Sequence, residues 1–138
     1  MFGFKKKTRK HDDIVLQIEN EAEQLFRSKK MNCAEAVLCT LKNHFRPDMP
    51  DEITHLATGF GGGSGSGCIC GALTGATMGM GMVISNDRKR LSALTRELHK
   101  WFTATYGATC CRVITSDQKG VCASLTGKVA GKALDLLL

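Results

Sequence analysis

The sequence predicts an all-α fold, a compact single-domain bundle of five to six helices. In several segments apolar residues recur every three or four positions, which is the spacing of a helix with one buried face. No segment alternates apolar and polar residues as a half-buried strand would. The length of 138 residues suits one domain, since single domains commonly contain roughly 100–150 residues.

The first two predicted helices lie on either side of a short polar turn. Residues 12–30 carry one apolar face and form the first helix. Asn32 can cap a second helix with its side-chain oxygen, and Glu35, three residues later, can complete a capping box. This helix is expected to run to about Phe45, with Cys33 in its first turn.

A glycine-rich loop separates the first half of the chain from the second. Prolines end the second helix, and residues 51–60 form a short helix that leads into the glycine and serine run at 59–67. The next helix, about residues 70–85, has glycines on one face at every fourth position: Gly71, Gly75 and Gly79. Another backbone can approach that face closely. This stretch contains too little continuous hydrophobicity for a bilayer span.

Two further helices complete the predicted bundle. Residues 88–106 again carry one apolar stripe, and Gly107 is a plausible stop for this helix. A polar turn at 116–120 precedes the closing helix, residues 121–138.

The charge is concentrated near the N-terminus. The formal net charge is +6, and much of the excess comes from Lys5, Lys6, Lys7, Arg9 and Lys10. We therefore expect residues 1–11 to form a flexible basic tail and residues 12–138 to form the helical, cysteine-rich domain. Because no aromatic-rich basic motif accompanies the charge, nucleic-acid binding is not expected.

Seven cysteines in a chain of this length are unusual. The N-terminus is basic and then acidic and contains no apolar signal segment, so a cytoplasmic location is expected. Thiols in the cytosol are kept reduced, and clusters of them more often bind metal or carry out redox chemistry than form a disulfide framework.

Common motifs do not account for the glycines or the cysteines. The glycine run lacks the GK[ST] ending of a phosphate-binding loop, and no C-x-x-C pair of a thioredoxin or zinc ribbon occurs. Cys33 and Cys70 instead fall at predicted helix starts, where free N–H groups and the helix dipole stabilise a thiolate. Cys39, in the middle of a helix, is interpreted as a core residue.

Several short stretches resemble a known family: NCAEAVL at 32–38, GFGGG at 59–63, CGALTGA at 70–76, CR at 111–112 and the final cysteine at 122. Over about residues 14–135 the chain resembles the CGAxxG (C-GCAxxG-C-C) family of redox-active proteins. The resemblance implies a redox domain at 12–138, a link to a membrane transporter system, and four signature cysteines: Cys33, Cys70, Cys111 and Cys122.

The chain is also similar to the iron–sulfur part of split-Soret cytochromes, although it lacks their haem motifs. This similarity implies a [2Fe–2S] cluster on the four signature thiolates. Cys68 and Cys110 are additional to the signature, so they could compete as ligands, resolve a disulfide, or have no role.

Three functions follow from these cysteines. The first is an iron–sulfur protein for electron transfer or redox sensing, in which Gly67 and Gly71 lie close to the cluster and a redox partner protein exchanges electrons with it. The second is a metal-free thiol switch or oxidoreductase with Cys70 as the attacking thiolate and Cys68, Cys110 or Cys111 as its partner. The third is a structural zinc site. A homodimer is a further expectation, and the glycine faces at 71–79 and 127–131 could pack within one chain or between two.

Overall fold

The computed structural model describes residues 2–118 and 120–138, with side chains from residue 9 onward. The α-helices are α1 (Phe2–Arg27), α2 (Cys33–Phe45), α3 (Gly71–Val83), α4 (Arg88–Tyr106), α5 (Cys111–Asp117) and α6 (Cys122–Leu137). Between α2 and α3 lie a 3-10 helix, η1 (Asp51–Phe60), and a short π-helical turn, η2 (Gly63–Gly67). Over the described residues the chain forms helices and no strand, so the predicted all-α fold is confirmed.

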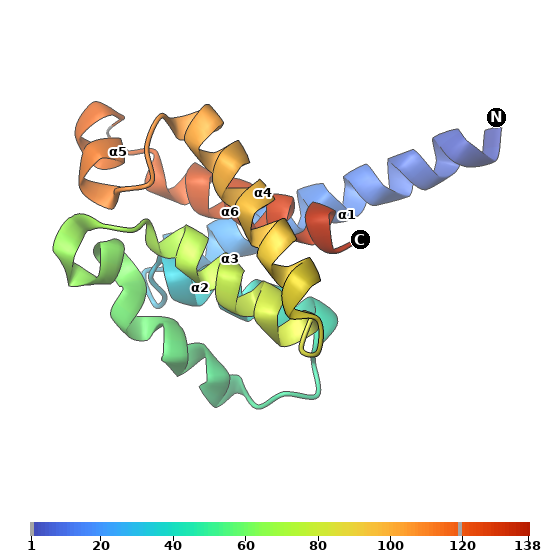
Figure 1. The fold of residues 1–138 in the computed structure, drawn as a ribbon, viewed down its shortest axis with the longest axis horizontal. Coiled ribbons are helices and arrows are strands. Elements are labelled where there is room, and N and C mark those ends of the chain that lie inside the picture. Colours follow the sequence, from blue (N-terminus) through green and yellow to red (C-terminus); the bar gives the residue numbers. More distant parts are fainter. Residues whose placement is uncertain (1, 119) are drawn as a thin grey trace.

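The bundle has two closely packed helix pairs, α1 with α6 and α2 with α3. Its largest fully buried side chains include Phe102 of α4, Leu73 and Met80 of α3, and Leu134 of α6. Figure 1 shows the N-terminal end of α1 extending beyond the bundle, while η2 and α5 lie at the opposite end. No helix in the described part of the chain is long and apolar enough to cross a membrane.

The first helix begins ten residues earlier than the sequence predicts. The expected helix was 12–30, whereas α1 runs from Phe2 to Arg27, so the backbone of residues 2–11 continues the helix. The side chains of residues 1–8 lie outside the described part. The flexible tail expected at residues 1–11 therefore stays a prediction.

The glycine faces are covered within the chain. A Cβ atom on Gly79 would lie 2.6 Å from Leu41 Cδ1, and one on Gly75 would overlap the carbonyl oxygen of Ala34, so α2 packs directly on this face of α3. On α6, a Cβ atom on Gly127 would lie 2.6 Å from the carbonyl oxygen of Glu19 in α1. The close approach expected at these glycines is therefore made between helices of one chain.

Helix α5 was not expected from the sequence. The segment 111–117 contains too few residues to display a helical period, and the polar residues that follow indicate a turn. Helix α4 does end as expected, at Gly107, whose φ of 84° is left-handed. The short helix α5 brings the third signature cysteine to the functional site.

Replacing Gly75 with alanine is expected to destabilise the protein by about 1–3 kcal/mol, because the added methyl group meets backbone of α2, which cannot move aside. Gly81→Ala is the matched control on the same helix, since its nearest neighbour is Leu91 Cδ2 at 3.7 Å. That control is expected to be neutral or to stabilise by up to about 1 kcal/mol through helix propensity. Urea unfolding measures both, and equal effects would contradict this account of the α2–α3 contact.

Candidate functional site

Four free cysteines line one small cavity at the end of the bundle where η2 and α5 lie. The cavity has a volume of about 20 Å³, and we refer to it as the cysteine cavity. Its lining comprises Cys33, Cys70, Cys111, Cys122, Ile114, Thr115, Leu125 and Thr126. The structure thus brings together the four cysteines that the family resemblance singles out, from positions up to 89 residues apart (122 − 33).

Each of these cysteines stands at the start of a helix. Cys33, Cys111 and Cys122 are the first residues of α2, α5 and α6, and Cys70 is the N-cap residue of α3. The first N–H groups of a helix have no partner within it, and the helix dipole is positive there. The sequence predicted this placement for two of the four, and the structure adds Cys111 and Cys122.

A capping box fixes the start of α2. Glu35 N–H donates to Asn32 Oδ1 at 2.9 Å, and Asn32 N–H donates to Glu35 Oε1 at 3.0 Å, as the sequence predicts. Asn32 Nδ2 also donates to the carbonyl oxygen of Thr58 in η1, at 2.9 Å. Cys33 is therefore held by its own helix and by η1 together.

Gly71 is required by the position of Cys33. A Cβ atom on Gly71 would lie 2.6 Å from Cys33 Sγ and 2.7 Å from the carbonyl oxygen of Phe60, so only glycine leaves this thiol room. Gly67, with a left-handed φ of 85°, lies instead against the side chain of Arg112 and is not part of the cavity lining. Its role toward a cofactor remains a prediction.

The surroundings of Cys33 and Cys70 favour the neutral thiol over the thiolate. Burial, followed by the nearby Cys33, raises the pKa of Cys70 from 9.0 to about 12, and the backbone N–H groups of Ala72 and Leu73 act against this rise. Burial likewise raises the pKa of Cys33, and the N–H groups of Gly62 and Ala34 oppose it. The N–H groups of Ala72 and Leu73 belong to the first turn of α3, and the N–H group of Gly62 belongs to the glycine-rich loop.

Three threonines follow cavity cysteines at a distance of four residues. Thr74, Thr115 and Thr126 donate their hydroxyls to the carbonyl oxygens of Cys70, Cys111 and Cys122, at 3.3, 2.9 and 2.7 Å. These bonds satisfy the hydroxyls within their own helices. Thr115 and Thr126 were not among the predicted site residues, although the repeated C-x-x-x-T spacing is visible in the sequence.

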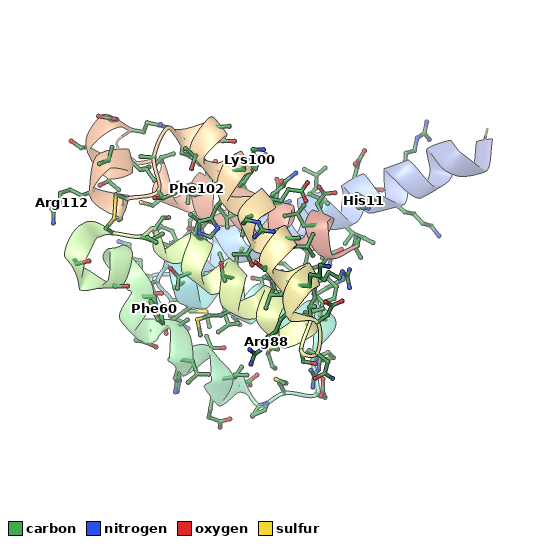
Figure 2. The ribbon with its side chains drawn as sticks, viewed as in Figure 1. His11, Phe60, Arg88, Lys100, Phe102 and Arg112 are labelled. Atoms are coloured by element: carbon green, nitrogen blue, oxygen red, sulfur yellow. A yellow bond between two sulfur atoms is a disulfide. The ribbon has the colours of Figure 1, made fainter. Side chains whose placement is uncertain are left out.

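The two additional cysteines are bonded to each other. Cys68, directly after η2, and Cys110, directly before α5, form a disulfide and do not line the cavity. Figure 2 shows this disulfide beside Arg112, at the end of the bundle away from His11. In this structure Cys68 and Cys110 are therefore neither cavity ligands nor partners of Cys70.

Two hydrogen bonds join the same two segments as the disulfide. Cys70 N–H donates to the carbonyl oxygen of Thr109 at 2.7 Å, and Arg112 Nη2 donates to the carbonyl oxygen of Ser66 at 2.8 Å. The loop that delivers Cys70 and the loop that delivers Cys111 are thus held together by three separate links.

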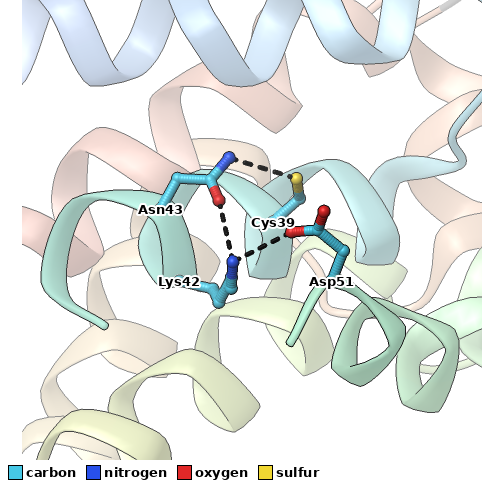
Figure 3. Close-up of polar contacts among 4 residues, drawn as sticks. All are labelled: Cys39, Lys42, Asn43 and Asp51. Carbon is cyan, nitrogen blue, oxygen red and sulfur yellow. Dashed lines mark hydrogen bonds and ion pairs between the residues drawn. The ribbon is translucent and has the colours of Figure 1, made fainter. Parts of the chain in front are cut away.

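Cys39 lies outside the cysteine cavity, in polar surroundings (Figure 3). Asn43 Nδ2 lies 3.5 Å from Cys39 Sγ, and the buried Lys42 donates to Asn43 Oδ1 at 3.3 Å and to Asp51 Oδ1 at 3.0 Å. Cys39 is half-buried, so its interpretation as a core residue holds only in part. This free thiol supplies a matched control for experiments on the cavity.

Over residues 2–118 and 120–138, no three His, Cys, Asp or Glu side chains are arranged to hold a single metal ion. The cavity thiols nevertheless lie near enough to influence one another. Burial is the main cause of the raised pKa of Cys33, Cys70 and Cys122, and the nearby Cys111 adds to the rise at each of them. The donor set is entirely sulfur, which is the type that soft metal centres prefer.

A family model described as "Putative redox-active protein (C_GCAxxG_C_C)" matches residues 31–136. The match includes all four cysteines of the cavity and both cysteines of the disulfide. No curated protein and no solved structure matches the chain.

The raised pKa of Cys70 predicts that the metal-free protein loses stability in alkaline solution. The folded protein keeps a proton on Cys70 that the unfolded chain releases near pH 9.0. The free energy of unfolding therefore falls between pH 9.0 and about 12, by up to about 1.4 kcal/mol per pH unit from this thiol. Anaerobic urea unfolding of Cys68→Ser/Cys110→Ser, which has no disulfide to reshuffle, measures this slope. If the pH dependence of the free energy of unfolding stayed the same after Cys70→Ala was added, the loss of stability could not be assigned to Cys70.

Proposed function

The chain belongs to the C_GCAxxG_C_C family, described as redox-active, and on this premise we propose that Cys33, Cys70, Cys111 and Cys122 hold an iron–sulfur cluster of the [2Fe–2S] type. Such a cluster, when bound, takes up and releases one electron at a time. The protein would serve electron transfer or redox sensing. The observation that carries this proposal is the meeting of four thiols from four helix starts in one cavity.

The electrostatics of the cavity support a metal centre. Burial disfavours thiolates at Cys33, Cys70 and Cys122 while the cavity holds no cation. A bound cation replaces the protons and removes this penalty, since metal ligation and thiol deprotonation are coupled. Backbone N–H groups at the helix starts and at Gly62 then donate to the anionic sulfurs, and such bonds tune the properties of a metal–thiolate centre.

The arrangement of the thiols favours a cluster over a single zinc ion. Structural zinc needs four ligands around one point, and the described residues offer no such group. In a two-iron cluster four cysteine sulfurs are shared between two irons, so they need not converge on one point. The cavity is small in this structure, so its lining would have to move apart to admit a cluster.

The surroundings of Cys70 argue against its role as an attacking thiolate. This thiol is only 6% exposed, and its pKa is raised to about 12. Nucleophilic cysteines are accessible and have a lowered pKa. The other three cavity cysteines are partly exposed, so the site lies near the surface, where a redox partner protein can approach it.

The test is anaerobic purification without a metal-binding tag, followed by an absorption spectrum and iron and sulfide analysis. Wild type is expected to show visible charge-transfer bands that disappear on Cys→Ser substitution at Cys33, Cys70, Cys111 or Cys122. Cys39→Ser is the matched control and is expected to keep the bands. Colourless protein that contains zinc would contradict the cluster and indicate a zinc site in its place. Protein that stays colourless and metal-free after reconstitution would contradict both.

Substitution of Gly71 tests whether close approach to Cys33 matters. Gly71→Ala places a methyl group 2.6 Å from Cys33 Sγ and is expected to make iron loss to a chelator roughly tenfold faster. Gly59→Ala is the control, because a Cβ atom there meets nothing within 4 Å. Circular dichroism of both variants verifies the fold. Equal rates of iron loss in a folded Gly71→Ala variant and its control would show that the absence of a side chain at Gly71 does not stabilise the cluster.

A further inference from the structure

The Cys68–Cys110 disulfide lies at the surface, apart from the cysteine cavity. Cys68 is exposed and Cys110 is half-buried, whereas Cys70, two residues after Cys68, is buried. Disulfides that solvent thiols can reach are the ones that take part in exchange. Cys68 is thus the more accessible of the two bonded cysteines.

We propose that this pair is a second redox centre, at which a thiol-bearing reductant from solution is oxidised while Cys68–Cys110 becomes a dithiol. The proposal goes beyond the cluster, since the reaction needs no metal. It assigns the chain a two-electron thiol–disulfide exchange activity alongside the one-electron chemistry proposed for the cavity.

The surroundings of the bond suit an incoming thiolate. Arg112 lies beside the disulfide and packs against Gly67, next to Cys68, so a guanidinium charge stands close to the bond. A nearby cation favours an anionic attacking sulfur. Ile69, which follows Cys68, and Val113, which follows Arg112, are 43% and 46% exposed and offer apolar contact to the rest of the reductant.

The exchange proceeds in two balanced steps. A thiolate attacks Cys68 Sγ, the sulfur of the more exposed of the two cysteines, and forms a new S–S bond to it. The Cys68–Cys110 bond breaks, and its electron pair leaves with Cys110 Sγ, which takes a proton from solvent. A second thiolate then attacks the reductant's sulfur in the mixed disulfide and releases Cys68 as a thiolate. Two thiols are thereby oxidised to one disulfide, and one protein disulfide is reduced to two thiols.

The structure also provides for reversal. When the bond is open, the hydrogen bonds from Cys70 N–H to Thr109 and from Arg112 to Ser66 still join the two segments. Neither bond involves a sulfur atom. Cys68 and Cys110 therefore stay close together as a dithiol, and an oxidising disulfide can close the bond again.

The first measurement uses wild-type, metal-free, full-length protein with glutathione as the probe. Free thiols are alkylated at intervals and located by peptide mapping. Cys68 and Cys110 are expected to be linked at the start and to open in the folded protein, with circular dichroism unchanged. A different pairing at the start would overturn the proposal. So would a bond that glutathione opens only after unfolding in urea.

The second measurement identifies the attacked sulfur. Cys110→Ser and Cys68→Ser are each incubated with glutathione disulfide, and the mixed disulfides are quantified by mass spectrometry. Capture at Cys68 in the first variant is expected to be about tenfold faster than capture at Cys110 in the second, because Cys68 is the more accessible. Cys39 is the internal reference, and capture at Cys68 no faster than at Cys39 would overturn the proposal. Neither measurement depends on whether the cavity binds a cluster.

Discussion

The architecture depends on bringing four cysteines to one cavity where helix N-termini meet. Burial raises the pKa of Cys33, Cys70 and Cys122 and so favours the neutral thiol at these three positions. At Cys33 and Cys70, backbone N–H groups at the starts of α2 and α3 supply the opposing interaction, since they donate to sulfur and stabilise its anion. The helices are arranged so that four such starts reach one cavity.

Glycine makes that convergence possible. Gly75 and Gly79 let α2 lie directly on α3, and Gly71 continues the same face to the point where Cys33 Sγ approaches. The same residues weaken α3 as an isolated helix. Packing against α2 offsets that weakness, so α3 is ordered by the contact that also positions the cysteine. Stability of the bundle and geometry of the site therefore rest on one row of residues.

Much of this arrangement is encoded locally and could be predicted. The Asn32–Glu35 capping box, the stop at Gly107 and the glycine face of α3 each follow from a few neighbouring residues, and each is present. Helix α5 could not be predicted because a helix of seven residues has too little periodicity. The pairing of Cys68 with Cys110 was equally hidden, since it depends on two loops that meet only in the folded chain.

The Cys68–Cys110 disulfide would also hold the chain together after a cut in the backbone between these two residues. The two residues are 42 positions apart, and the chain between them forms α3, an exposed turn at 85–87, and α4. Proteolysis in that turn would leave two fragments, one carrying Cys33 and Cys70 and the other carrying Cys111 and Cys122. The fragments would remain tethered as one molecule, and each would hold half of the cavity. Only reduction of the bond would let them separate.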